Sequence, residues 1–377
     1  MTVLYRKYRP QKLADLVGQD HIKKTLSAQL ATGKISHAYL FSGPKGTGKT
    51  TTARILAKAV NCKKYDKGRK DTIKALKASL ADQVVFGEPC NQCDSCLAVL
   101  QDRHLDVIEI DAASNRGIDD VRSLRESIKL APISARFKVY IVDEVHMLTT
   151  EAANALLKTL EEPPAHAIFI LATTTPEKMP ETIISRCQAF LFFPATKEQL
   201  LESLKKVVVA EGAKLSDEIF AKIAEKSDGS YRDGFVLLEK VLSQKELDEA
   251  TLTSLLAGVD FGVLAKLAQK LSEKNAKEAI LLLNNLIAQG VSAQAINSEF
   301  VQFLRNLLFV KVGVFEPVGE KRENSKELTK LSQNFSQNQI LELLKLFETA
   351  SQQKNSPIAQ LPQELAIAQF CLASPKS

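Results

Sequence analysis

The chain has 377 residues, 45% of them hydrophobic, which is enough for two or three domains with cores of their own. The formal net charge of +6 permits a polyanionic partner without requiring one, because scattered Lys and Arg also keep proteins soluble. The charged start, Met1 to Pro10, lacks the apolar stretch of a signal peptide, and no run reaches the ~18 apolar residues of a membrane span. The six cysteines are not spaced as a disulfide framework. We therefore expect a cytoplasmic protein with reduced thiols and no membrane partner.

Three regions follow one another along the chain. In residues 1–194, short apolar runs alternate with helical patterns, which predicts an α/β doubly wound sheet. Four runs have the β-branched and aromatic content of buried parallel strands: Ala38–Phe41, Asp106–Ile110, Val139–Val142 and Ala167–Ala172. Residues 195–242 are predicted to form a small helical domain, and residues 243–377 a second all-helical domain. We expect a loop at Gly313–Ser325 and fraying at residues 373–377.

One segment matches the phosphate-binding pattern G-x-x-x-x-G-K-[ST] in full. It lies between a predicted strand and a predicted helix, Thr51–Ala59, which is the setting the pattern requires. Its glycines let backbone N–H groups approach phosphates closely, Lys49 would reach the β- and γ-phosphates, and the Thr50 hydroxyl would bind Mg²⁺. We expect the whole segment to bind a nucleoside triphosphate: Gly43, Pro44, Lys45, Gly46, Thr47, Gly48, Lys49 and Thr50.

The apolar run Val139–Val142 ends in two carboxylates, Asp143 and Glu144. Asp143 can hold the Mg²⁺ through water, and Glu144 can orient and polarise the attacking water. A kinase would normally lack the second acid, because water must be kept from its γ-phosphate. The pair therefore favours hydrolysis over transfer to another acceptor.

Three later side chains fit the same chemistry. Thr174 ends the predicted strand Ala167–Ala172, where a polar side chain can position the water, although a run of threonines is also typical of a turn. Arg186, in Ser185-Arg186-Cys187, and Arg232, in the segment Gly229–Asp233, supply the side chain that stabilises charge on a transferred phosphoryl group. A single arginine is more often an ordinary surface residue.

Taken together and in this order, these motifs resemble the clamp-loader branch of the AAA+ ATPases, most closely the gamma/tau subunits of bacterial DNA polymerase III, across nearly the whole chain. The resemblance implies that Thr174 is sensor 1, that Arg232 is sensor 2, and that Arg186 completes the ATP site of a neighbouring subunit. The opening Tyr5–Pro10 and the following Val17-Gly18-Gln19 are similar to the family's N-terminal segment, which packs around the adenine. Its binding residues here would be Tyr8, Arg9, Pro10 and Val17.

The resemblance also implies a function. The chain would be an ATP-hydrolysing clamp-loader subunit of the replicative DNA polymerase III holoenzyme, a DNA-directed DNA polymerase and hence a nucleotidyltransferase. ATP binding would drive the opening and loading of the sliding clamp on primer–template DNA, and hydrolysis would release it. The expected partners are the other subunits of a heteropentameric ring with several copies of this chain, the sliding clamp, primer–template DNA without sequence preference, and single-stranded-DNA-binding protein through the complex.

In this family, residues 195–242 correspond to the helical lid that carries sensor 2, and residues 243–377 to the collar that holds the ring together. Longer relatives continue beyond this point to bind the replicative helicase and polymerase, and we expect those contacts to be absent from this chain.

The cysteine spacing Cys90-x-x-Cys93-x-x-Cys96 offers three thiolates, and Cys62 ends the helix after the phosphate-binding loop. Four thiolates suit a closed structural Zn²⁺ site, giving a zinc module over residues 62–96, although an iron–sulfur cluster uses the same ligands. His104 competes for the fourth position, and the family resemblance favours Cys62. The basic stretch 63–89 is longer than the family's usual link, which leaves Cys62 less constrained.

The segment Ser114-Asn115-Arg116-Gly117, before a helix expected near Asp119, suits a DNA backbone phosphate or a plain helix cap equally well.

Three alternatives to a clamp-loader motor remain open. An accessory clamp-loader subunit that cannot hydrolyse ATP is disfavoured by the intact Lys49, Thr50 and Glu144. An AAA+ remodeller or branch-migration helicase would carry a C-terminal winged helix. A scaffold with a vestigial ATPase would be unaffected by Lys49→Ala.

Overall fold

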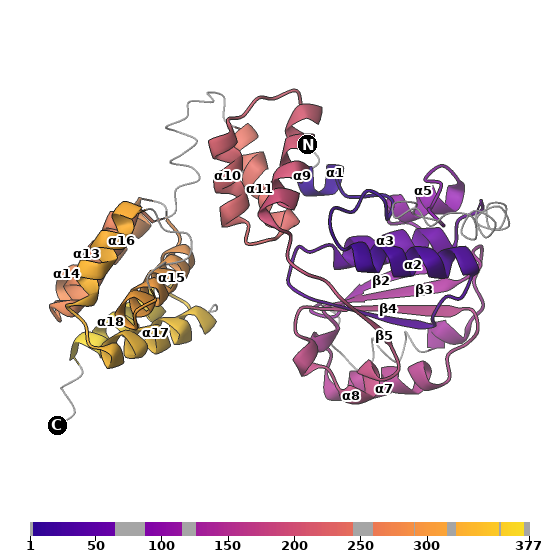
Figure 1. Cartoon of the computed structure of the whole chain (residues 1–377). Helices are drawn as coiled ribbons and strands as arrows, with labels where there is room; N and C mark the ends of the chain where they lie inside the picture. Colours follow the sequence, from indigo (N-terminus) through magenta and orange to yellow (C-terminus); the bar gives the residue numbers. More distant parts are fainter. Residues whose placement is uncertain are drawn as a thin grey trace. The chain divides into compact units, whose positions relative to one another are not determined.

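The computed structural model describes residues 3–64, 87–114, 126–243, 259–289, 291–314, 322–353 and 356–372. They belong to two compact units, Met1–Leu247 and Asp248–Ser377, which Figure 1 colours from indigo to rose and from orange to yellow. Several predicted features lie wholly or mostly outside the described residues: the basic stretch 63–89, Asn115-Arg116-Gly117 with the helix near Asp119, and residues 373–377. Of the predicted loop Gly313–Ser325, residues 315–321 lie outside them, and the prediction was wrong at its end, because a helix begins at Arg322.

The first unit is built on a parallel sheet. Its described strands run in the order β2-β3-β4-β1-β5, and every neighbouring pair is parallel. Their bounds are β1 Ala38–Ser42, β2 Val107–Asp111, β3 Lys138–Asp143, β4 Ala167–Thr173 and β5 Gln188–Leu191. The four predicted strands are confirmed as parallel strands, but the predicted burial was wrong for β2, which lies at one edge of the described sheet and has no buried residue. The strand β5 was missed. It is an edge strand with only Phe190 buried, so its sequence lacks the continuous apolar run of the central strands.

Helices cover both faces of this sheet (Figure 1). Asp20–Thr32 (α2) and Lys49–Val60 (α3) lie on one face, and Thr150–Glu161 (α7) and Glu181–Ile184 (α8) on the other. Successive side chains of a strand point to opposite faces, so Tyr39 and Phe41 join one buried cluster while Ala38 and Leu40 join the other. The predicted doubly wound α/β architecture is confirmed. It brings the carboxyl ends of β1, β3 and β4 to one edge, where open α/β sheets bind ligands.

The remaining short elements of the first unit connect these layers. They are the helices α1 Leu4–Lys7 and α5 Asp94–Leu100, and the 3₁₀ turns η1 Val145–Met147 and η2 Pro176–Lys178. None of them extends the sheet; α1 and η1 instead bring side chains to its carboxyl edge.

Three helices follow the sheet in the first unit: α9 Lys197–Ala210, α10 Asp217–Lys226 and α11 Tyr231–Leu242. Side-chain caps begin two of them. Thr196 and Gln199 form a capping box at α9, and the Ser230 hydroxyl accepts from Asp233 N at α11. The chain is also tied to itself across this region, because Ala195 N donates to Gly229 O at 2.9 Å and Tyr231 N to Gly46 O at 3.1 Å. Helix α11 therefore starts directly on the phosphate-binding loop.

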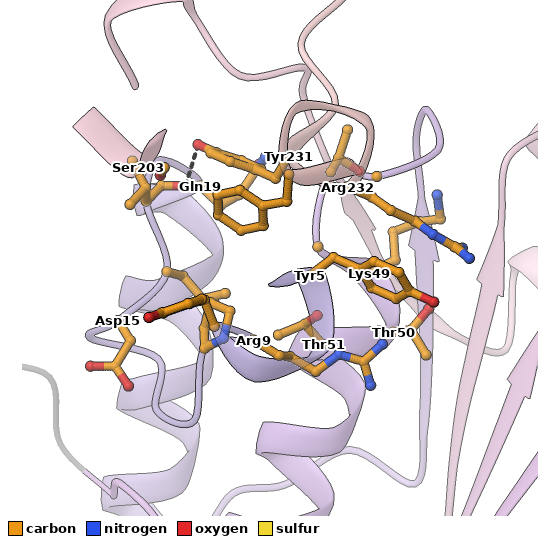
Figure 2. Close-up of a pocket in the computed structure, with 18 of the residues that line it drawn as sticks. Tyr5, Arg9, Asp15, Gln19, Lys49, Thr50, Thr51, Ser203, Tyr231 and Arg232 are labelled. Atoms are coloured by element: carbon orange, nitrogen blue, oxygen red, sulfur yellow. Dashed lines mark hydrogen bonds between the residues drawn. The ribbon is translucent and has the colours of Figure 1, made fainter. Parts of the chain in front are cut away.

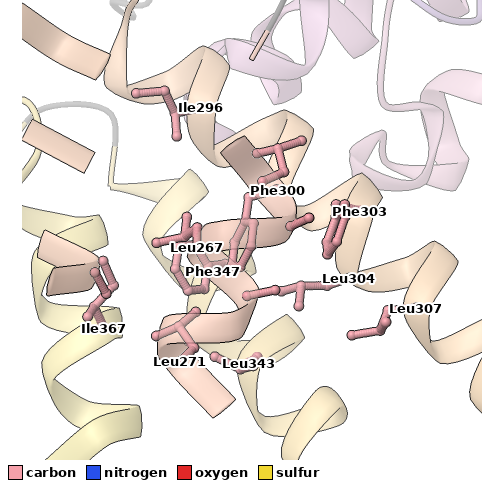
Figure 3. Packing of buried hydrophobic residues seen from close by; sticks show 14 of the residues in the cluster. Leu267, Leu271, Ile296, Phe300, Phe303, Leu304, Leu307, Leu343, Phe347 and Ile367 are labelled. Carbon is pink, nitrogen blue, oxygen red and sulfur yellow. The ribbon is translucent and has the colours of Figure 1, made fainter. Parts of the chain in front are cut away.

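The second unit is helical throughout its described residues, as predicted. Its helices are α13 Phe261–Ser272, α14 Ala276–Ala288, α15 Ala293–Lys311, α16 Arg322–Ser332, α17 Gln337–Gln352 and α18 Leu361–Leu372. Phe300, Phe303 and Phe347 lie at the centre of its core (Figure 3). The Phe300 ring stands edge-on to Phe347, with centroids 4.8 Å apart, and is stacked parallel to Phe303 at 6.1 Å.

No helix among the described parts of either unit is both long and apolar enough to cross a membrane.

Replacing Phe300 by Ala is expected to destabilise the second unit by about 3–5 kcal/mol, because the side chain is completely buried and its removal leaves a cavity. Urea unfolding followed by hydrogen exchange of the α15 amides measures this unit separately from the first. Leu281→Ala, at a side chain that is 52% exposed, is the matched control and should change stability by less than about 0.5 kcal/mol. Equal midpoints for the two variants would show that the aromatic cluster does not hold this unit together.

Candidate nucleotide site and cysteine cluster

A cavity of about 610 Å³ opens at the carboxyl edge of the sheet, within the size range of small-molecule sites. Four parts of the first unit surround it: the N-terminal segment, the phosphate-binding loop with the start of α3, the ends of β2 and β3 at Asp111, Asp143 and Glu144, and the helices α9 and α11 (Figure 2). The predicted residues among its lining are Tyr8, Arg9, Pro10, Val17, Lys45, Gly46, Thr47, Gly48, Lys49, Thr50, Asp143, Glu144 and Arg232.

The phosphate-binding loop is shaped by close backbone approaches. Gly43 has φ +139°, and a Cβ there would lie 2.2 Å from Phe192 O; a Cβ on Gly46 would lie 1.9 Å from Ser230 Oγ. Lys49 is 6% exposed, and its ammonium donates to Gly43 O at 2.7 Å and to Pro44 O at 2.8 Å. Burial lowers the pKa of Lys49. Gly43 and Pro44 thus do not line the cavity themselves but hold the lysine that does.

The predicted magnesium and water-activating residues lie together at the ends of β3 and β4. Thr50 Oγ1 donates to Asp143 Oδ2 at 2.8 Å. Glu144 Oε2 accepts from Thr174 Oγ1 at 3.0 Å and from Thr174 N at 3.2 Å. Glu144 has φ +47°, a left-handed conformation that is uncommon for a residue with a side chain. The parallel order of β1, β3 and β4 therefore brings together four residues that are up to 124 positions apart (174 − 50).

His146 is a neighbour of this group to which the sequence analysis gave no role. Its Nδ1 lies 3.0 Å from Thr173 Oγ1 and 3.4 Å from Glu144 Oε2. The residue follows Glu144 by two positions, but only the 3₁₀ turn η1 directs its ring back to the strand ends, so spacing alone carried no signal.

The wall opposite the phosphate-binding loop comes from the N-terminal segment and the last helices of the unit. The Arg232 guanidinium lies 4.9 Å from the centre of the Tyr5 ring, and Tyr231 Oη donates to Val17 O at 2.9 Å (Figure 2). Most residues of this wall were not predicted as binding residues: Tyr5, Asp15, Leu16, Gln19, Ser203, Lys206, Val207, Ala210, Tyr231 and Phe235. The α9 members recur at helical spacing, a signal that marks a helix face without saying what it faces.

Arg186 is not among the residues that line the cavity. It follows α8, and its guanidinium pairs with Glu161 Oε1 at 2.7 Å and donates to Thr182 O at 2.8 Å. Its side chain is about one-third exposed. The structure therefore separates Arg186 from the other predicted catalytic residues of its own chain.

The structure brings Cys62 to the cysteine triplet. The sulfurs of Cys62, Cys90, Cys93 and Cys96 all lie within 4.8 Å of one another, and Cys90 and Cys96 are 4.0 Å apart. Four thiolates around one tetrahedral ion at ~2.3 Å would be about 3.8 Å apart, so the cluster fits a single ion with little movement. A four-iron cluster would hold its thiolates farther apart, because its metal atoms occupy the space between them.

His104 is not part of this cluster. Its Nε2 lies 3.0 Å from Ser95 Oγ, and its Nδ1 accepts from Asp106 N at 3.1 Å, so both ring nitrogens are engaged elsewhere.

The thiols of the cluster differ in how readily they ionise: burial raises the pKa of Cys62 and, more strongly, that of Cys96, whereas the pKa of Cys90 is lowered. Burial opposes ionisation there, but N–H groups of Gln92 and Cys93 and the neighbouring thiols lower the pKa of Cys90 to about 6.

Two family models match this chain. Residues 18–196 match the DNA polymerase III delta subunit model, and residues 247–375 match domain III of the DNA polymerase III gamma and tau subunits. Among solved structures, the RuvB Holliday junction branch migration motor of Thermotoga maritima aligns with a TM-score of 0.47 and 20% identity, over 75% of this chain and 86% of that one. A likeness at this level does not by itself establish a shared function.

Curated relatives match over most of the chain. The tau subunit of Bacillus subtilis is 40% identical over 382 residues, or 99% of this chain, and that of Escherichia coli K12 is 37% identical over 82% of it. This chain spans 64% and 46% of those two proteins. The gamma subunit of Buchnera aphidicola subsp. Schizaphis graminum is 36% identical, and there the match covers 90% of this chain and 89% of the relative. The chain therefore belongs to the family of the gamma and tau subunits of DNA polymerase III.

Proposed function

We propose that this chain is an ATPase subunit of a clamp loader, in which ATP binding assembles a ring that opens a sliding clamp on primer–template DNA and hydrolysis releases it. The observation that carries the proposal is the single cavity that joins the phosphate-binding loop to Asp143 and Glu144. Membership of the gamma and tau family supports the clamp and the replication assembly as partners.

The cavity has a polar end and an aromatic end, as a nucleotide requires. At the polar end, backbone N–H groups of residues 45–50 and the Lys49 ammonium would hold the β- and γ-phosphates. A phosphate would give that ammonium an anionic partner in place of the two carbonyls it now contacts. At the other end, Tyr8, Pro10 and Val17 would enclose the base.

Hydrolysis needs a water placed in line with the bond between the γ-phosphorus and its bridging oxygen. Glu144 would accept a proton from that water as its oxygen attacks phosphorus, and the bridging oxygen would leave with ADP. Thr174 would hold the Glu144 carboxylate or the water, because its hydroxyl lies 3.0 Å from Glu144 Oε2. Mg²⁺, when bound by Thr50 and Asp143, would neutralise phosphate charge. Arg232, from α11, would contact the bound nucleotide and so link nucleotide binding to the position of the helices α9 to α11.

Arg186 would act on the ATP of a neighbouring subunit. Its exclusion from its own cavity and its partly exposed side chain support a role in trans, with the Glu161 pair broken when the ring assembles. On this proposal residues 195–242 are a lid on the nucleotide and residues 243–377 a collar that joins subunits, so hydrolysis depends on the assembled ring.

The cysteine cluster would hold a structural Zn²⁺ ion. The sulfur separations, the burial of Cys62 and Cys96 and the all-thiolate ligand set support zinc in a closed site. The ion would neutralise half of the charge of four thiolates and fix the loop that carries them.

Glu144→Gln is expected to leave ATP binding within about threefold of wild type while lowering hydrolysis by about 10² or more, because the amide keeps the shape but cannot accept the proton. Calorimetric ATP binding and phosphate release in the assembled complex measure the two separately. Lys49→Ala is the companion variant, and it should lose ATP binding itself. Undiminished turnover by Glu144→Gln would contradict the assigned role.

Arg186→Ala is expected to keep ATP binding but to lose most of the turnover that partner subunits, sliding clamp and primed DNA stimulate, by about 10³ if the arginine stabilises the transition state. Arg103→Ala, at another exposed arginine of the same unit, is the control and should turn over normally. Full stimulated turnover by Arg186→Ala would rule out the shared site.

The purified chain is expected to contain one zinc ion, and Cys93→Ser to lose it, as measured by elemental analysis. Cys371→Ser, in the other unit, should retain the full amount. Finding no zinc in wild type, or the same amount in the chain with Cys93→Ser, would overturn the assignment.

A further inference from the structure

The cysteine loop and the nucleotide cavity share a boundary. Residues 8–10 line the cavity, and the chain then makes a short turn, Gln11–Asp15, before returning to the cavity at Asp15 and Leu16. Asp15 Oδ2 closes this turn by accepting from Gln11 N at 3.3 Å and from Lys12 N at 3.0 Å. Residues 8–10 and 15–17, on either side of the turn, form the part of the cavity lining that would face the base, called here the base-facing wall. The position of the turn therefore sets the position of this wall.

Glu88, two residues before Cys90, holds the turn from outside. One of its carboxylate oxygens accepts from Leu13 N at 2.9 Å and the other from Ala14 N at 2.8 Å. With Asp15 and Glu88 together, four consecutive backbone N–H groups of the turn are bonded to carboxylates. Charge-assisted bonds of this kind are stronger than bonds between neutral groups.

Lys58 makes the second connection. It is 1% exposed on α3, and its ammonium donates to Gln11 O at 2.9 Å, to Gln11 Oε1 at 2.7 Å and to Asn91 Oδ1 at 2.9 Å. Gln11 in turn donates through Nε2 to Arg9 O at 2.8 Å. A chain of hydrogen bonds thus runs from the loop between Cys90 and Cys93 to a residue that lines the cavity.

The loop that carries Glu88 and Asn91 is fixed at both ends. A Cβ on Gly87, which has φ +76°, would lie 2.4 Å from Leu30 Cβ, so the loop is packed against α2. Beyond Glu88, Cys90 N donates to Cys62 Sγ at 3.4 Å, and Cys93 N to Cys90 Sγ at 3.3 Å. The contact with α2 at one end and the cysteine sulfurs at the other therefore fix the positions of Glu88 and Asn91.

We propose that the cysteine cluster, through Glu88 and Lys58, positions the base-facing wall of the nucleotide cavity, so that metal occupancy controls affinity for the adenosine part of ATP. Glu88 and Lys58 are positioning residues, since neither touches the cavity. The inference rests on the proposed function, in which the cavity binds ATP. The two ends of the nucleotide then depend on different segments. The phosphate-binding loop holds the phosphates by itself, while the wall that binds the adenosine part needs the cysteine loop.

The test compares ATP with inorganic tripolyphosphate, which lacks the base and the ribose, on the full-length chain by calorimetry. Glu88→Gln should weaken ATP binding by about tenfold, because the amide no longer accepts two charge-assisted bonds, and should leave tripolyphosphate binding within about twofold. Lys58→Met should act in the same direction. Asp94→Asn is the matched control. It removes a carboxylate from the same cysteine segment, and this carboxylate is 89% exposed and pairs with the exposed Lys63 at 2.7 Å.

Two further measurements test the inference, and the first of them needs no nucleotide. Hydrogen exchange of the Leu13 and Ala14 amides should become faster in the Glu88→Gln chain while zinc content stays equal to wild type. Removing zinc from the wild-type chain with a chelator should weaken ATP binding by a similar factor and again spare tripolyphosphate.

Unchanged ATP affinity in the Glu88→Gln and Lys58→Met chains would overturn the inference while leaving the proposed function intact. Equal weakening of ATP and tripolyphosphate would also overturn it, because the damage would then reach the phosphate-binding loop. A wild-type chain that binds neither ligand would refute the proposed function, and the inference with it.

Discussion

The backbone contact between Tyr231 N and Gly46 O, 3.1 Å long, joins the phosphate-binding loop to the first turn of α11. It is possible only because Gly46 has no side chain, since a Cβ there would overlap Ser230 Oγ. The contact places Tyr231 and Arg232 over the cavity, and Tyr231 then anchors the N-terminal segment through Val17 O. Loop, helix and N-terminal segment thereby enclose one volume, and the proposed ATP site depends on this enclosure.

Within this enclosure the proposed catalytic groups are held by hydrogen bonds to other residues of the chain. Asp143 is bonded to Thr50, Glu144 to Thr174, and Lys49 to carbonyls of its own loop. Each of these side chains would have to exchange a protein partner for a phosphate, a metal ion or a water when ATP binds. Such exchange would couple nucleotide binding to the conformation of the strand ends and of α11. In a motor of the proposed kind, this coupling would let the rest of the chain respond to whether ATP or ADP is bound.

The cysteine cluster fits into the same scheme as a support for one wall. It lies outside the cavity, yet Glu88 and Lys58 connect it to the turn that follows Pro10. The proposed metal site would fix this loop, because an ion bound by four thiolates constrains all four positions that carry them. Arg186, by contrast, is bonded to Glu161 away from the cavity, which suits a residue whose proposed partner lies in another subunit.

The sequence alone determined the local parts of this protein. The glycine-rich loop Gly43–Thr50 between a strand and a helix, the carboxylates after β3, the cysteine triplet and the strands β1 to β4 could be predicted because each depends on residues that are neighbours in the chain. The tertiary structure alone decided the edge strand β5, the engagement of His104 with Ser95 and the α9 face of the cavity. The family resemblance had favoured Cys62 as the fourth cysteine, but only the structure brings it to the triplet. These depend on packing between segments far apart in the sequence. Periodicity and spacing cannot reveal such contacts, because they describe one segment at a time.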